Sequence, residues 1–183
     1  PELGKIPLTD RNQVYGKDLY DEVERFSKIA EVIAKEEEHD VIHAHDWMAY
    51  KAGMNAKKVS GKPLVCHIHA TEFDRTGDNP NQGVYDIEKY GLHEADKIIT
   101  VSNYTKQKII EHYGINQDKI SVVYNAVEQE DKVPAFKINT GEKIVLFLGR
   151  ITLQKGPDYF VETANRVLKY YPNVKFVISG SGD

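Results

Sequence analysis

The stretch VLFLGRITLQKGPDYF, from Val145 to Phe160, decides how the fold of this chain is interpreted. Its apolar opening predicts a buried strand that ends in glycine, and Arg150 follows at once. A short polar loop then brings Lys155 to the start of an amphipathic helix. Two cations at a strand end, beside the positive end of a helix, are typical of a site for a diphosphate. The alternative is a solvated loop in which these cations pair with Asp158 or Glu162.

The rest of the chain repeats this alternation of apolar strands and amphipathic helices. Strands are expected at 40–47, 62–70, 96–102 and 119–127, and helices at 18–38, 47–58, 85–93 and 103–113. This order predicts an α/β fold with a parallel sheet that helices cover on both faces. Residues 71–83 are polar and too many for a tight turn, so they are expected to form a functional loop. Ser102 is expected to cap the helix that follows it.

A second unit of the same type is expected after a linker. Residues 128–142 are charged, contain proline and glycine, and show no sustained period, which is typical of an interdomain linker. The elements expected beyond it are a strand, a helix and a strand, at 143–149, 157–171 and 174–180. This piece cannot bury both faces of its sheet, so residues 1–127 and 143–183 are expected to be parts of two domains. The chain opens with proline and ends in Gly-Ser-Gly-Asp straight after a strand, and we expect both ends to be cut.

The composition limits the classes of protein that fit. The chain has 183 residues, of which 40% are hydrophobic and 28% charged, with a formal net charge of -4. This balance is typical of a globular protein and unlike that of a basic nucleic-acid binder. No apolar run approaches the roughly 20 residues that span a bilayer, and Cys66 is the single cysteine. We therefore expect a reduced, cytoplasmic protein with no disulfide, no membrane span and no nucleic-acid partner.

Polar side chains gather at the predicted carboxyl ends of the strands, where open α/β sheets bind their ligands. Residues two apart share a face of a strand, so His43 points with His45, and His67 with His69. Two such strands could hold zinc in a metal-dependent hydrolase, although Trp47 stands where the metallo-β-lactamase pattern has a further histidine. The alternative is that the two deeper histidines, His43 and His67, are hydrogen-bonded in the core.

Two other features of the sequence bear on catalysis. Glu72 and Asp74 follow the second histidine strand as a potential pair of catalytic carboxylates. The simpler interpretation is that both carboxylates are solvated at the surface. The Gly-Ser-Gly sequence at residues 180–182 fits many turns and by itself indicates no function.

Five stretches of the chain, taken together, resemble one family. In order they are DVIHAHDW, CHIHATEFD, ADKIITVS, VVYNAV and FLGRITLQKG. They are similar to the retaining GT-B glycosyltransferases that include glycogen synthases and sucrose-type synthases, and the resemblance runs from Val41 to Asp183. It implies two Rossmann-like domains that face each other across a cleft, the first holding mainly the acceptor and the second mainly the nucleotide-sugar donor. Residues 1–127 would then be the C-terminal part of the acceptor-side domain, and 143–183 the opening of the donor domain.

The resemblance also implies roles for individual residues. Arg150 and Lys155 match the pair that grips the donor diphosphate and stabilises it as the leaving group, and Gly149 precedes them at the strand end. His69 matches the histidine near the transferred sugar, and Asp46 matches the aspartate of the HDW strand end. We therefore expect His69, Arg150 and Lys155 to act in catalysis. Asp46 and Gly149, together with the basic pair, are expected to bind substrate.

The resemblance sets the expected substrates as well. The donor would be a UDP-, ADP- or GDP-sugar and the acceptor a carbohydrate or another hydroxyl compound, with neither a metal nor another cofactor required. The glycine-rich loop of the family's first domain and the glutamate pair of its second are not found in the chain, and Asn125-Ala126 replaces the commoner Asn-Gly. We therefore expect a fragment that is inactive alone. A non-catalytic sugar- or nucleotide-binding module is the remaining alternative, and the sequence predicts no oligomeric state.

Overall fold

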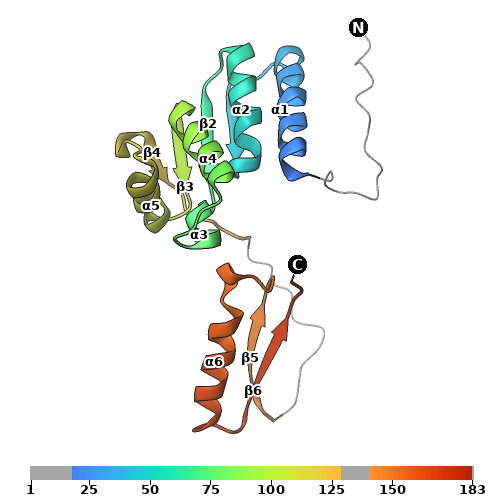
Figure 1. The fold of residues 1–183 in the computed structure, drawn as a ribbon, viewed down its shortest axis with the longest axis vertical. Helices are drawn as coiled ribbons and strands as arrows, with labels where there is room; N and C mark the ends of the chain where they lie inside the picture. The colour runs from blue at the N-terminus through green and yellow to red at the C-terminus, as the bar shows by residue number, and fades with distance from the viewer. Residues whose placement is uncertain (1–17, 129–140, 183) are drawn as a thin grey trace. The chain divides into compact units, whose positions relative to one another are not determined.

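The computed structural model describes residues 18–128 and 141–182 (Figure 1). Residues 129–140, which make up most of the predicted linker, lie outside the described residues, as does the polar segment before residue 18. The described chain separates into two compact units, with the main boundary after Asn125. Each unit has its own sheet, so each is described by itself.

The first unit is built on a four-stranded parallel sheet, which confirms the predicted α/β class. The strands lie in the order β1-β2-β3-β4, the same as their order in the chain. In chain order, the elements as far as β4 are α1 (Leu19–Glu36), β1 (Ile42–His45), α2 (Asp46–Ser60), β2 (Leu64–Ile68), α3 (Glu72–Thr76), α4 (Gln82–Glu94), β3 (Lys97–Thr100), α5 (Asn103–Tyr113), the 3-10 helix η1 (Gln117–Lys119) and β4 (Ile120–Val122). Apart from α3, they belong to the first unit.

Two glycines show which face of the sheet the helices cover. A Cβ added at Gly53 of α2 would lie 2.9 Å from Cβ of Ala44 in β1. A Cβ added at Gly91 of α4 would lie 2.7 Å from the ring of Tyr50, and the Gly91 carbonyl accepts the Cys66 thiol of β2 at 3.5 Å. Helices α2 and α4 therefore pack closely on the face that carries Ala44 and Cys66.

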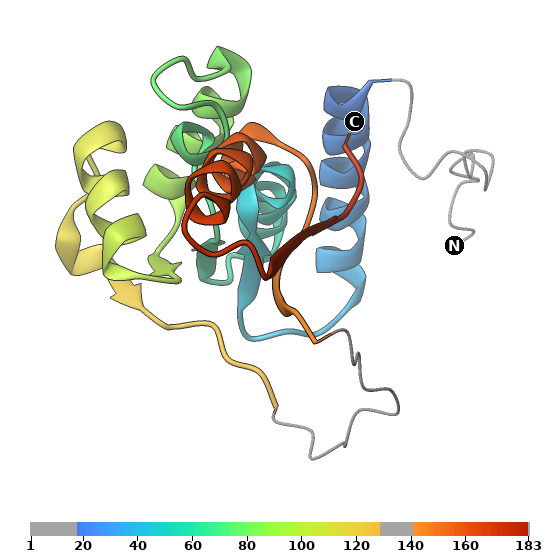
Figure 2. The same cartoon turned by 90° about the horizontal axis from the view of Figure 1, so that it is seen from below.

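The predicted cover on both faces is wrong for residues 18–128. Each parallel crossover advances to the next strand in the same direction, and right-handed crossovers of this kind put every connecting helix on one face. Helix α1 lies beside α2 in two perpendicular views (Figure 1 and Figure 2). Because successive side chains alternate across a strand, His43, His45 and His67 lie on the other face, which no described helix of this unit covers.

The core between the sheet and the helices explains the apolar strand pattern. Tyr50, Leu64, Cys66, Ile68, Leu92, Ile98 and Ile109 have no exposed surface. Ser102 caps α5 as predicted, since its hydroxyl accepts the backbone N–H of Thr105 at 3.0 Å. The predicted loop at 71–83 is shorter than expected, because α3 lies within it and Asn81 caps the start of α4.

The second unit is a separate strand–helix–strand piece, as predicted. Its elements are β5 (Lys143–Leu148), the 3-10 helix η2 (Leu153–Lys155), α6 (Pro157–Leu168) and β6 (Val174–Ser179), with the two strands parallel. Phe160 of α6 packs against Phe147 and Phe176, each at 5.5 Å between ring centroids. None of residues 141–182 is fully buried. Across both described ranges, no helix combines the length and the apolar character that crossing a membrane requires.

Candidate functional site

Asp46 joins β1 to α2 without an intervening loop. Its φ of 58° makes it the one residue other than glycine with positive φ in the described ranges. Aspartate adopts this left-handed conformation more readily than most residues, at a cost of about 1–2 kcal/mol. The conformation places Oδ1 of Asp46 where it accepts the backbone N–H of His69 at 2.8 Å. A strained residue therefore ties the carboxyl ends of β1 and β2 together.

His69 lies at the same strand ends, in the position expected for it. Its ring stacks on the ring of His67 with centroids 4.3 Å apart, and its Nε2 is 3.1 Å from Nδ1 of His45. His69 is exposed and His67 is half-buried, which confirms that His67 lies deeper. The structure thus brings together two of the predicted site residues, Asp46 and His69.

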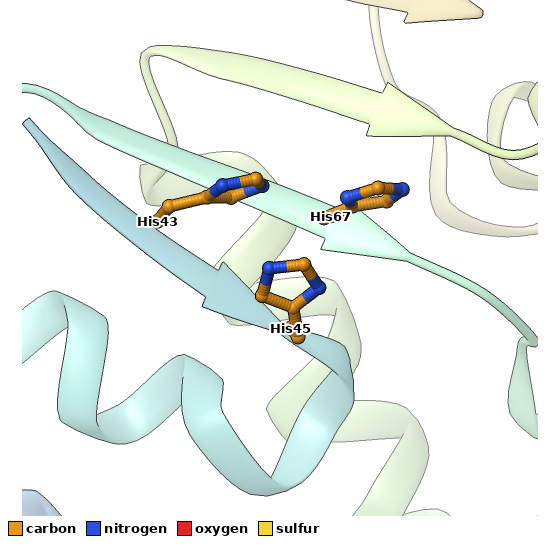
Figure 3. A group of neighbouring side chains, drawn as sticks. All are labelled: His43, His45 and His67. Carbon is orange, nitrogen blue, oxygen red and sulfur yellow. The ribbon is translucent and has the colours of Figure 1, made fainter. Parts of the chain in front are cut away.

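Four histidines, His43, His45, His67 and His69, form what we call the histidine cluster. Figure 3 shows three of them, His43, His45 and His67. The rings of His43 and His67 are parallel within 3° and have centroids 5.4 Å apart. His45 approaches both, at 4.3 Å from His43 and 4.9 Å from His67. One ring nitrogen from each of these three residues lies within 4.8 Å of the other two.

Two rings of the cluster, those of His43 and His67, favour the neutral form. Burial and, after it, the neighbouring rings of His69, His45 and His43 lower the pKa of His67 to about 4, while Asp46 opposes the change. Partial loss of solvent around the ring is also the main cause of the lowered pKa of His43. The prediction that His43 and His67 are hydrogen-bonded core residues is wrong. His43 is exposed, and both shielded ring nitrogens of His67 have no hydrogen-bond partner among the described residues. The reason is that the helices pack on the opposite face.

A buried carboxylate network stands next to this strand end. Glu72 is only 4% exposed, and its Oε1 accepts the backbone N–H of Asn81 at 3.2 Å. Its own N–H donates to Oε2 of Glu88 at 3.0 Å, and Glu88 also accepts the hydroxyl of Tyr113. The interpretation of Glu72 as a solvated surface residue is therefore wrong. Sequence reasoning missed Glu88, whose place on the apolar face of α4 was the available signal.

The predicted basic pair lies at the carboxyl end of β5 in the second unit. Gly149 has a φ of 156°, a conformation that favours glycine, and the exposed Arg150 follows it. Lys155 ends η2, directly before Gly156 and the first turn of α6. Glu162 pairs with Arg166 one helical turn along α6. In the solvated-loop alternative, Arg150 and Lys155 pair with Asp158 or Glu162. Glu162 is already engaged by Arg166.

The Gly-Ser-Gly sequence has a structural reason that the sequence did not reveal. A Cβ added at Gly180 would lie only 1.8 Å from the carbonyl oxygen of Gly149. The backbone N–H of Gly149 donates to Ser179 at 3.1 Å, and that of Ile151 donates to Ser181 at 2.9 Å. Glycine at position 180 is therefore required for the loops after β5 and β6 to run side by side.

Comparison with known proteins identifies the family. The family model for Glycosyltransferase Family 4 matches residues 10–131. The chain belongs to glycosyltransferase family 4. A second model, Glycosyl transferases group 1, matches residues 128–183. These matches confirm the predicted resemblance. They place the family 4 chain among the glycosyltransferases and not among the metal-dependent hydrolases that the His-x-His strands suggested.

Individual relatives agree with this assignment. The chain is 33% identical over 162 residues to an uncharacterized glycosyltransferase of Methanocaldococcus jannaschii, covering 80% of this chain and 41% of that protein. It is 28% identical over 148 residues to a glycogen synthase of Mycobacterium tuberculosis, covering 78% and 36% respectively. The family 4 chain thus spans less than half the length of these relatives.

A solved structure confirms the predicted GT-B-type fold. The crystal structure of HepE from Anabaena, in complex with UDP and glucose, matches with a TM-score of 0.63. The match covers 86% of this chain and 43% of that one, at 16% sequence identity. At this identity the likeness concerns the fold alone.

Proposed function

We propose that the chain belongs to a retaining glycosyltransferase that moves a sugar from a nucleoside-diphosphate sugar to a hydroxyl acceptor. The observation that carries this proposal is the placement of Arg150 and Lys155 beside a glycine turn at the carboxyl end of β5. Membership of glycosyltransferase family 4 supports the same reaction class.

The basic loop suits the donor diphosphate. Arg150 offers a planar fork of N–H donors, and Lys155 offers a compact positive charge. The first turn of α6 adds partial positive charge from its free backbone N–H groups. Negative charge grows on the leaving diphosphate as the bond to the sugar breaks. Positive groups already fixed in place stabilise that charge without reorganisation.

The first unit suits the acceptor and the transferred sugar. The Asp46 carboxylate accepts the backbone N–H of His69, and the His69 ring stacks on His67, so both side chains have a defined place at the strand ends. In the proposed retaining reaction the departing phosphate assists the acceptor hydroxyl, and no enzyme nucleophile is required. The engagement of Glu72 in holding the turn that ends at Asn81 agrees with such a reaction.

The relatives support particular substrates. HepE is solved with UDP and glucose, and one relative is a glycogen synthase. We propose a UDP-, ADP- or GDP-sugar as the donor and a carbohydrate as the acceptor. Transfer of glucose to a glucan, as in a glycogen synthase, is the specific form of this proposal.

Calorimetric titration of the Lys155→Ala variant tests the donor site. A charge-assisted contact contributes about 1.5–3 kcal/mol, so binding of UDP, ADP or GDP should weaken by about ten- to a hundredfold. Binding of the bare nucleoside should change little, because it lacks the phosphates. Lys169→Ala, just past the last turn of α6, is the matched control and should leave both affinities unchanged. Unchanged diphosphate binding in Lys155→Ala would make Lys155 a solvated loop residue and remove the main support for this function.

A further inference from the structure

The histidine cluster has features that the glycosyl transfer does not use. His45 and His67 are direct neighbours in the register of β1 and β2, and His43 lies two residues before His45 on the same face. Figure 3 shows the three rings gathered on one side of these strands. A tetrahedral ion with bonds of about 2.1 Å holds its ligand nitrogens about 3.4 Å apart. The ring nitrogens of the three residues lie within 4.8 Å of one another, so they would have to move closer together to reach that value.

His67 lacks a partner that such an ion would supply. Neutral imidazole carries one donor and one acceptor nitrogen, and both nitrogens of His67 are shielded without a hydrogen bond among the described residues. An unsatisfied buried polar atom costs about 1–3 kcal/mol. Coordination of a metal ion by one ring nitrogen of His67 would satisfy that nitrogen. It would also explain why this polar ring is shielded by the rings of the other three histidines.

His45 already has the contact that usually orients a metal-binding histidine. Its Nδ1 is 3.1 Å from Nε2 of His69. When Nδ1 carries the proton and donates to His69, Nε2 of His45 keeps its lone pair for a metal. The contact fixes both the tautomer and the angle of the ring, so His69 would support the site from outside the ligand set.

We propose that His43, His45 and His67 bind one divalent transition-metal ion, with Zn²⁺ as the expected species. An all-imidazole set favours zinc, cobalt, nickel or copper over magnesium and calcium, which prefer oxygen ligands. Three protein ligands leave a fourth position for water. The family resemblance implies a transfer reaction that requires no metal, and the proposed site does not depend on that reaction.

Cobalt and zinc titrations of the full, tag-free, metal-stripped chain test this site. We expect one equivalent of Co²⁺ to give visible d–d absorption of a low-coordinate site, and Zn²⁺ to displace it. No thiolate charge-transfer band should appear, because Cys66 points to the opposite, helix-covered face. His43→Ala and His67→Ala should each weaken Zn²⁺ binding by about a hundredfold or more, since each removes a ligand.

Three comparisons make the test decisive. His112→Ala removes an exposed histidine on α5, outside the cluster, and should leave Zn²⁺ affinity unchanged. Circular dichroism of each variant confirms folding, and His43→Gln replaces an exposed ring if an alanine variant fails to fold. Absence of stoichiometric binding would overturn the proposal. So would equal loss of binding in His112→Ala, or a thiolate band that disappears in Cys66→Ala.

Discussion

The two units of this chain use the same strand–helix–strand pattern and hold their polar residues in different ways. Leu64 at the start of β2 has no exposed surface, whereas Leu146 and Leu148 of β5 are 55% and 76% exposed. The first unit has four strands and four long helices, α1, α2, α4 and α5, that share a core. The second has two strands and one helix, too few elements to enclose the side chains of its sheet.

The candidate site residues of the two units are therefore held in position by different interactions. In the first unit, His69 is fixed by stacking on His67, by a ring contact to His45 and by its backbone N–H, which donates to the carboxylate of Asp46. In the second unit, Arg150 and Lys155 are exposed on a loop whose backbone, and not a packed core, sets its path. Geometry in the first unit therefore comes from packing. In the second it comes from glycine conformations and backbone hydrogen bonds.

Thiol labelling should give the largest difference between the units. Burial raises the pKa of the Cys66 thiol to about 12, so the reactive thiolate is scarce at pH 8. We expect Ser181→Cys, made in a Cys66→Ser background, to react at least about a thousandfold faster than Cys66 in the native chain. Absorbance after addition of an aromatic disulfide reagent measures both rates, and urea should abolish the difference. Rapid labelling of native Cys66 would show that the first unit has no closed core.

The buried carboxylate of Glu88 should account for the next largest effect. Glu88→Ala removes the acceptor of the Glu72 N–H and of the Tyr113 hydroxyl inside the first unit. We expect its free energy of unfolding to fall by about 2–5 kcal/mol. Urea titration followed by fluorescence of Trp47, the single tryptophan, measures this. Glu111→Ala on the exposed side of α5 is the control, and similar losses in both variants would contradict a special role for Glu88.

Backbone contact should govern the second unit. Gly180→Ala would place a Cβ against the Gly149 carbonyl, so the two loops must separate and the Gly149 N–H must lose its bond to Ser179. We expect amide exchange of Gly149 to become about ten- to a hundredfold faster, since overpacking costs about 1–3 kcal/mol. In Gly182→Ala the new Cβ meets Ile151 at 3.1 Å, and the change should be smaller. Unchanged exchange in Gly180→Ala would show that these loops are not held by their close approach.

Much of the fold could be predicted because its signals are local. Apolar runs, helical periods and the Ser102 cap each depend on a few consecutive residues, and the structure confirms them. The prediction that helices cover both faces of the sheet was wrong because helix placement depends on strand order, which no local sequence pattern encodes. Once every crossover advances in one direction, the helices gather on one face.

The candidate site divides in the same way. Asp46 and His69 could be placed together because residues at the ends of neighbouring parallel strands meet at one edge. The prediction that His67 is hydrogen-bonded in the core was wrong because its face of the sheet is not covered by a described helix of the first unit. Glu88 was missed because its partners lie 16 and 25 residues away, beyond the reach of any periodic pattern.

The smallest expected effect tests whether the loop cations of the second unit are free to bind an anion. Arg166→Ala removes the exposed ion pair with Glu162 on α6, and such pairs contribute at most about 1 kcal/mol to stability. If Arg150 and Lys155 serve a diphosphate, calorimetry should find nucleoside-diphosphate affinity changed by less than about twofold. The alternative, in which Glu162 pairs with these cations, predicts that the released carboxylate competes with the ligand. Affinity would then fall in Arg166→Ala and return when Glu162→Gln is added. That pattern would show that neighbouring side chains, and not glycine and backbone alone, control the cations of this loop.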